Sequence, residues 1–181
     1  MLLSTPYLGV AASKPDKIST SIGLGTHNYS GQIDRILNRY SANKKWGRLV
    51  THVDLVGLYW IQNNSHILLG ANLAADIDML SVEHADFYFL NFHTTFSGLY
   101  FVNNNHKALF FRGDIGFLRR MIAGDPHFEP EYTWGFSSML AVGYAIPIFK
   151  NKTTHLQLQF MPTLIKNKLE THLGTSIGFM F

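Results

Sequence analysis

The dominant pattern along the chain is an alternation of hydrophobic and polar positions with a period of two. Between residues 65 and 79, the odd positions are mainly hydrophobic, whereas most even positions are small or polar. Such alternation places side chains on opposite faces of a β-strand. The same period recurs at 18–27, 48–61, 86–102, 107–119, 132–148, 156–164 and 169–181. The pattern therefore predicts eight strands and no long helix.

The segments between these strands predict an up-and-down arrangement. Three short connections rich in Asn or Lys, at 62–65, 102–106 and 149–153, suit hairpin turns. They alternate with connections that we expect to be generally longer, at 28–47, 79–85, 120–131 and 165–168. Within the longest of these, Ile33, Ile36 and Leu37 share one helical face, which would suit a short surface helix, but we favour a solvated charged loop.

The chemistry of the two strand faces distinguishes a membrane barrel from a soluble cup. The hydrophobic face carries charge only at Lys107 and Arg119, at the two ends of one strand. An eight-stranded barrel has too little interior for the aromatic residues of this face, such as Phe92 and Trp134. These side chains must point outward, where only lipid tolerates them. We therefore predict an all-β, eight-stranded, antiparallel up-and-down transmembrane β-barrel.

Aromatic residues near the predicted strand ends favour the same interpretation. Tyr59, Tyr100 and Phe179 are expected to point outward near the short connections, where they would form an interfacial girdle. The predicted inner face of the same region includes Val56 and Leu58.

Composition narrows the functional classes. The chain of 181 residues is 46% hydrophobic but only 15% charged, and its mean hydropathy is +0.03. Its net charge of +3 is spread along the sequence without a dense basic block, so no nucleic-acid partner is expected. The absence of cysteine excludes disulfides, thiolate catalysis and cysteine-based zinc sites.

The length suits a single domain covering 1–181. Residues 17–181 would form the barrel, and residues 1–16 an extension, an extra strand or a plug.

With these features the chain resembles the small bacterial outer-membrane barrels, the group of the OmpA membrane domain, OmpX, OmpW and the opacity-like surface antigens. The resemblance rests on the alternating strands, the short turns and a final strand that ends in an aromatic residue. It implies residence in the outer membrane, with the short turns in the periplasm. It also implies contact with outer-membrane lipids and lipopolysaccharide and insertion by the barrel-assembly machinery. The family's terminal assembly signal matches Gly174, Ile177 and Phe179, although the chain continues to Phe181.

The inner face of the predicted barrel collects the candidate chemistry. We expect a polar network that fills the lumen, because buried charges require partners. Its predicted members are Asp54, Asp76, Asp78, Asn91, His93, Arg112, Asp114, Glu170 and His172.

Two sharper interpretations of the same residues stay open. His52, His93 and His172 near Asp54, Asp76 or Glu170 could supply a general base and its orienting acid. The catalytic candidates are His52, Asp54, His93 and His172. The same histidines, with Asp54, Asp76 or Glu170, could instead bind a divalent metal. On balance we assign no metal site and no cofactor.

The predicted function is surface structure, adhesion, or contact with a host or other ligand through the loops. Two alternatives are a lipid-modifying enzyme, either a PagP-like acyltransferase or a lipid A deacylase, and a narrow channel for small hydrophobic molecules. The catalytic motifs of the two enzyme types have no clear match in this chain, so we favour a non-enzymatic role.

Overall fold

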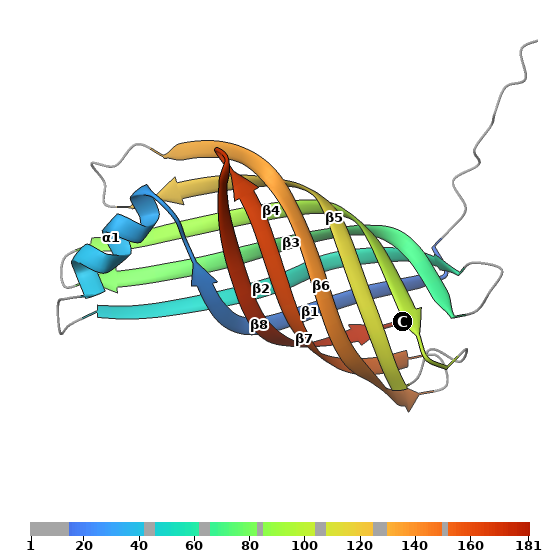
Figure 1. Ribbon diagram of the computed structural model, residues 1–181. Coiled ribbons are helices and arrows are strands. Elements are labelled where there is room, and N and C mark those ends of the chain that lie inside the picture. The colour runs from blue at the N-terminus through green and yellow to red at the C-terminus, as the bar shows by residue number, and fades with distance from the viewer. Residues whose placement is uncertain are drawn as a thin grey trace, which may run out of the picture.

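The protein forms a closed barrel of eight antiparallel strands, each hydrogen-bonded to its neighbours in sequence order, with β1 and β8 closing the ring (Figure 1). This computed structural model describes residues 15–41, 46–61, 66–82, 85–103, 108–124, 130–149 and 152–181. The predicted fold class is confirmed. The elements are β1 (Lys17–Asn28), α1 (Gln32–Ser41), β2 (Trp46–Ile61), β3 (Ile67–Val82), β4 (Ala85–Phe101), β5 (Ala108–Ala123), β6 (Glu131–Phe149), β7 (Lys152–Ile165) and β8 (Lys168–Met180).

The two ends of the barrel differ. We call the end that carries α1 the α1 mouth, and the end where β1 begins and β8 finishes the terminal mouth (Figure 1). At the α1 mouth, only two residues separate β3 from β4 and β7 from β8. Lys166 and Asn167 in the second of these turns have φ angles of 48° and 60°, as in a type I′ hairpin turn. The expectation of generally longer connections at this end therefore holds mainly for the segment that contains α1.

The outer wall of the barrel is a continuous hydrophobic belt. Large apolar side chains on all eight strands point away from the lumen, and Trp134 and Ile115 are more than 65% exposed. A soluble protein does not present so large an apolar surface, whereas a lipid-embedded barrel requires it. The strands of 12 to 19 residues exceed the roughly 9–11 needed to cross a bilayer. The protein is thus a membrane-spanning barrel of the outer-membrane type.

No helix in the described part of the chain has the length and apolar character needed to cross a membrane.

A β-bulge in β2 overturns part of the predicted face assignment. Asp54 pairs with Ala74 and Val56 pairs with Leu73, so Leu55 is an extra residue without a partner in β3. One extra residue exchanges the faces for the rest of the strand. Tyr59, expected on the outer wall, is fully buried in the lumen. Val56 and Leu58, expected inside, are part-exposed on the outer wall.

An apolar cluster closes the lumen at the terminal mouth. Gly57 and Gly70 make room for the ring of Tyr59: a Cβ at Gly57 would lie 2.7 Å from its Cε2 atom, and one at Gly70 would lie 2.9 Å from its Cδ1 atom. The Tyr59 hydroxyl lies 3.1 Å from Ser97 Oγ, which satisfies its polar group. We call this group the lower cluster, and its members are Tyr59, Leu68, Leu99, Phe101, Phe110, Ala145 and Met180.

A second apolar cluster lies under α1 at the opposite end. Ile33 of the helix is 4% exposed, and Leu37, one turn further along the helix, packs against the same group. Gly31, at φ 69°, turns the chain from β1 into the helix, and its carbonyl accepts the first helical hydrogen bond from the Arg35 amide. The segment therefore forms the helix and not the favoured charged loop, because its apolar face is buried against this end of the lumen. This upper cluster comprises Tyr29, Ile33, Leu80, Phe87, Phe89 and Ile122.

Residues 1–14, which hold most of the expected N-terminal extension, lie outside the described residues. So do residues 104–107, which include Lys107 at the start of the predicted fifth strand.

Candidate functional site: the lumen and the α1 mouth

Buried polar side chains fill the lumen between the lower and upper clusters. All nine residues of the predicted lumen network are buried, with exposed fractions of 6% or less. They point inward because they occupy alternate positions of their strands. The register shows which of them meet: His52 lies beside Asp76 on β3, and His27 lies beside His172 on β8. The network divides into three groups of contacts.

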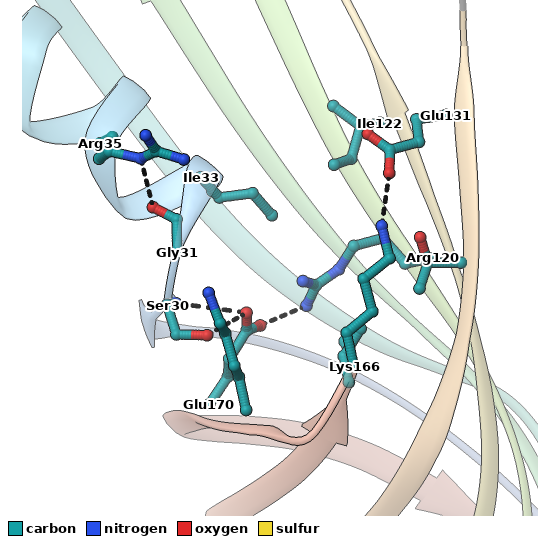
Figure 2. A pocket seen from close by; sticks show the side chains of 12 residues that line it. Ser30, Gly31, Ile33, Arg35, Arg120, Ile122, Glu131, Lys166 and Glu170 are labelled. Carbon is teal, nitrogen blue, oxygen red and sulfur yellow. Dashed lines mark hydrogen bonds and ion pairs between the residues drawn. The ribbon is translucent and has the colours of Figure 1, made fainter.

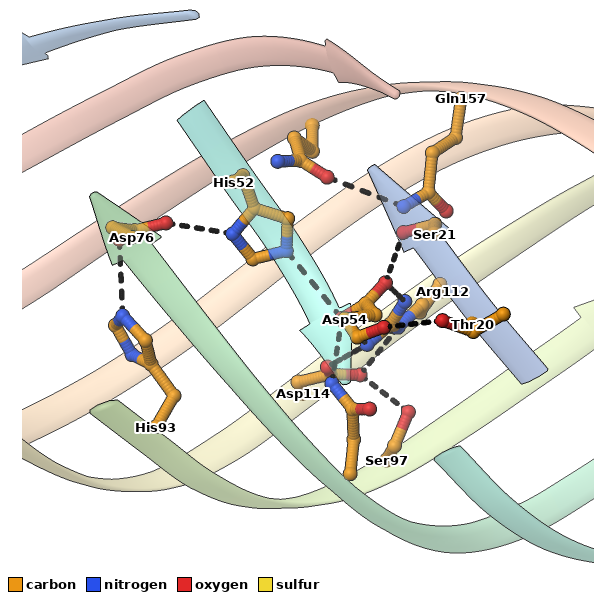
Figure 3. A network of polar contacts seen from close by, with 12 residues as sticks. Thr20, Ser21, His52, Asp54, Asp76, His93, Ser97, Arg112, Asp114 and Gln157 are labelled. Carbon is orange, nitrogen blue, oxygen red and sulfur yellow. Dashed lines mark hydrogen bonds and ion pairs between the residues drawn. The ribbon is translucent and has the colours of Figure 1, made fainter. Parts of the chain in front are cut away.

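The Arg112 cluster lies nearest the lower cluster, and its guanidinium clamps two carboxylates (Figure 3). Arg112 Nη1 and Nη2 donate to Asp54 at 2.7 and 3.0 Å, while Nε and Nη2 donate to Asp114 at 3.0 and 2.7 Å. Neighbouring side chains also donate to these carboxylates. Ser21 and Asn72 donate to Asp54, and Ser97 donates to Asp114. Both carboxylates are therefore fully engaged in charge-assisted hydrogen bonds.

The Asp76 cluster lies further toward α1 and is built from histidines. Asp76 is fully buried; its Oδ1 accepts from His52 Nδ1 at 2.6 Å and its Oδ2 from His93 Nε2 at 3.0 Å. His52 Nε2 lies 3.4 Å from Asp54 Oδ1, so this ring joins the two clusters (Figure 3). His93 Nδ1 lies 2.8 Å from Ser137 Oγ. Ser137, His93 and Asp76 are thus connected in this order by two hydrogen bonds through the His93 ring.

Two further histidines of the Asp76 cluster have no hydrogen bond among the described residues. His172 is fully buried, and its Nδ1 lies 3.6 Å from Asp76 Oδ1. His27 is 4% exposed; its ring stacks on Tyr29 at 4.0 Å, and its Nε2 lies 3.8 Å from Glu170 Oε2. Neither ring nitrogen of either residue has a hydrogen-bond partner. Buried polar atoms in this condition are uncommon.

The third group consists of two arginine–carboxylate pairs at the α1 mouth. Arg48 donates to Asp78 at 2.6 Å and to the His27 carbonyl at 2.8 Å. Arg120 donates to Glu170 at 2.6 Å and to Asn91 at 2.8 Å. The pairing with Asp78 places Arg48 at the mouth of the lumen.

Beside α1 lies an open pocket of about 220 Å³. Figure 2 shows Arg35 and Ile33 on the helix side and Arg120, Glu131 and Lys166 on the strand side. We call it the mouth pocket, and its charged residues are Arg35, Arg120, Lys166, Lys168, Glu131 and Glu170.

The buried charges of the lumen do not balance. The described lumen holds five carboxylates (Asp54, Asp76, Asp78, Asp114 and Glu170) and three guanidiniums (Arg48, Arg112 and Arg120). His52 faces a carboxylate oxygen with each of its two ring nitrogens, so it offsets one of these charges as an imidazolium, and one negative charge remains. Asp76 is the carboxylate for which no contact with an arginine is observed, and its partners are histidines. The charge deficit is therefore associated with the Asp76 cluster.

The structure brings together the catalytic candidates His52, Asp54, His93 and His172, but it also adds residues that the sequence interpretation missed. Arg120 lies one residue beyond the predicted strand at 107–119, and extending the period-two pattern by that residue would include it. Arg48 is the first residue of the predicted strand at 48–61, on its inner face. Ser137 lies on the predicted inner face of β6, but its small size gives no signal of a contact with His93. The predicted assembly-signal residues Ile177, Phe179 and Phe181 all point outward, and Gly174 points inward.

Comparison with solved structures places the fold among the small outer-membrane barrels. Ail, the attachment invasion locus protein of Yersinia pestis, superposes with a TM-score of 0.54 and 11% identity over 93% of this chain and 100% of that chain. Ail in complex with the heparin analogue sucrose octasulfate gives a TM-score of 0.55 and 14% identity over the same shares. Neisserial surface protein A gives a TM-score of 0.54 and 9% identity, covering 90% of this chain and 94% of that chain.

No protein-family model matches the chain, and no curated protein sequence matches it. The likeness is thus one of fold.

Proposed function

We propose that this barrel is an outer-membrane surface protein that binds an anionic saccharide, one bearing sulfate or phosphate groups, in the mouth pocket. In this proposal the α1 mouth faces the outside of the cell and the terminal mouth faces the periplasm. The role is contact with a ligand, not transport or catalysis.

The observation that carries the proposal is the charge of the mouth pocket. Four cationic and two anionic side chains line it, so it has an excess of two positive charges. Lys166 is held by Glu131 at 2.8 Å, and Arg120 by Glu170. Arg35 and Lys168 have no carboxylate partner among the described residues, and a Cβ at Gly31 would lie 2.6 Å from the Lys168 Nζ atom. These two cations remain available to an anion.

The closed lumen supports contact at the mouth over passage through the barrel. Tyr59, Phe101 and Phe110 are almost completely buried in the lower cluster, and Phe89 and Leu80 are equally buried in the upper one. A filled interior is expected for eight strands. The Ser137–His93 pair is not assigned a catalytic role, because both residues are only 3% exposed and a substrate would have to enter this packed interior.

The size of the pocket and one structural neighbour guide the choice of probe. A volume of about 220 Å³ is below the roughly 300–1,000 Å³ of sites for drug-sized ligands, so it suits one charged sugar unit. Ail, which shares the fold, has been crystallised with sucrose octasulfate. A sulfated sugar is therefore an appropriate first ligand, and a phosphorylated lipid A sugar is the second.

The test is calorimetric titration of the refolded barrel in detergent with sucrose octasulfate, lipid A disaccharide phosphate and uncharged sucrose. We expect binding of an anionic sugar that weakens as salt rises, and no binding of sucrose. Lys168→Gln and Arg35→Gln should each weaken it about threefold to tenfold. Lys152→Gln is the matched control, because Lys152 lies at the terminal mouth beside Phe181.

Preference for the sulfated sugar would favour an external ligand, whereas preference for the lipid A sugar would favour a lipid of the same membrane. Equal binding by wild type and by the Lys168→Gln/Arg35→Gln double variant would refute the pocket. Failure of every anionic sugar to bind would refute the proposed function.

A further inference from the structure

We propose that His27, Asp76 and His172 form a binding site for a divalent transition-metal ion of the zinc type inside the lumen. The inference goes beyond ligand contact at the mouth and concerns a different group of side chains. It also departs from the sequence-based expectation that the chain has no metal site.

The first argument is geometric. One ligand atom from each of these three residues lies within 4.8 Å of the others, and all three residues are buried. The pairing of β1 with β8 sets His27 directly beside His172. Zinc binds imidazole nitrogen and carboxylate oxygen at about 2.0–2.2 Å, so small rotations of the rings would bring the ligands into range. Two imidazoles and one carboxylate are a donor set that zinc uses.

The second argument is the unused hydrogen-bonding capacity of the two imidazoles. Among the described residues, the ring nitrogens of His27 and His172 have no hydrogen-bond partner, although each residue is at least 96% buried. By contrast, both nitrogens of His52 and His93 face carboxylate or hydroxyl oxygens. The four histidines around Asp76 therefore divide into two that hold the carboxylate in place and two that are free to donate lone pairs. The expected metal set of His52, His93 and His172 is replaced by His27 and His172.

The third argument is charge. The described lumen has two more carboxylates than guanidiniums, and the carboxylate for which no arginine contact is observed is Asp76. The His52 imidazolium offsets one of these charges, and a cation between Asp76 and the neutral imidazoles of His27 and His172 would offset the other. Buried carboxylates need such compensation because desolvated charge is costly.

The fourth argument concerns entry. Glu170 lines the mouth pocket, and its Oε2 lies 3.8 Å from His27 Nε2. The pocket as a whole carries an excess of positive charge, but at its inner side Glu170 places a carboxylate next to the first imidazole of the site. Since Glu170 is paired with Arg120, we assign Glu170 to the entry path of the ion and not to its ligands.

The experiment is titration of the refolded, chelator-treated barrel with zinc chloride by calorimetry. We expect one zinc ion per chain. His27→Leu and His172→Leu should each weaken binding at least tenfold, since even residues that only orient metal ligands are worth about 10- to 100-fold. His155→Leu is the matched control: His155 is 5% exposed in the same lumen and has an unpartnered Nδ1, but it packs against Phe110.

A measurement on the wild-type barrel covers the case in which a variant fails to fold. X-ray absorption of the zinc-loaded protein should show two imidazole nitrogens at about 2.0–2.1 Å. The proposal is overturned if the folded wild type binds no zinc saturably, if fewer than two imidazoles ligate the ion, or if His155→Leu weakens binding as much as the other variants. Sucrose octasulfate binding by His172→Leu reports on the mouth pocket separately.

Discussion

The Arg112 cluster and the Asp76 cluster lie side by side in one lumen, and His52 contacts both, yet they satisfy their polar groups differently. In the Arg112 cluster one guanidinium binds two carboxylates bidentately, and hydroxyl and amide groups complete the network. In the Asp76 cluster one carboxylate is surrounded by four imidazoles, of which two make no hydrogen bond.

This difference follows from the side chains themselves. A guanidinium carries five fixed donors and no acceptor, so it can only bind anions, and a buried one without them is unfavourable. An imidazole has two nitrogens that donate or accept according to protonation, and either can bind a metal. The Arg112 cluster is therefore a closed structural clamp, whereas the Asp76 cluster keeps ligand capacity in reserve.

The largest expected effect is the loss of the clamp. Arg112→Met leaves Asp54 and Asp114 buried without their cation, and breaking a buried ion pair in this way costs about 3–5 kcal/mol. The free energy of unfolding can be measured from the urea dependence of the folded fraction in lipid vesicles, with gel migration of unheated samples as the readout. Arg119→Gln on the outer wall of the same strand is the control, with an expected loss of about 1 kcal/mol or less from its contact with Tyr132. Equal losses in the two variants would contradict the clamp.

A smaller loss is expected in the Asp76 cluster. Asp76→Asn removes the charge that His52 and His93 donate to, and hydrogen bonds to charged groups contribute about 1.5–3 kcal/mol. The same urea titration measures the change in unfolding free energy. Asp86→Asn, where the carboxylate is exposed and accepts from Ser81, should change it by about 0.5 kcal/mol or less. A loss as large as that of Arg112→Met would mean that the two clusters are not distinct.

The boundary between the Arg112 cluster and the lower cluster gives the next effect. Tyr59→Phe removes the hydroxyl contact to Ser97, which itself donates to Asp114, and should cost about 0.5–1.5 kcal/mol. Tyr100→Phe, on the outer wall, should change stability by about 0.5 kcal/mol or less. Urea unfolding of both variants tests the bulge in β2. A larger loss of stability in Tyr100→Phe than in Tyr59→Phe would indicate that Tyr59 lies on the outer wall.

Most of the fold was predictable because a membrane imposes a strict alternation on every strand. From Tyr132 onward, the pattern assigned the faces of β6, β7 and β8 correctly. The exception was β2, where an inserted Leu55 changes the register without interrupting the hydrophobic pattern: Val56, Leu58 and Trp60 are as plausible on an outer wall as Gly57 and Tyr59. The sequence alone does not show which of these two sets of β2 residues faces the lipid.

The membership of the lumen was also predictable, whereas its partnerships were not. Period-two alternation identifies which side chains point inward but says nothing of strand stagger. The stagger brings His27 beside His172 and sets His52 beside Asp76, so it decides which histidines are held by the carboxylate and which are free. Asp54, a catalytic candidate from the sequence, is bound by Arg112.

The smallest expected effect distinguishes the two kinds of imidazole in the Asp76 cluster. In the presence of a chelator, His172→Leu should change the free energy of unfolding by about 0.5 kcal/mol or less, because this ring makes no hydrogen bond within the described part of the chain. His52→Leu should cost about 1.5–3 kcal/mol, since it removes the shortest contact to Asp76. When zinc replaces the chelator, the wild type should gain stability through binding to the folded state, and His172→Leu should not. If His172→Leu instead loses as much as His52→Leu with the chelator present, its ring is a structural partner of Asp76 and the contrast between the clusters disappears.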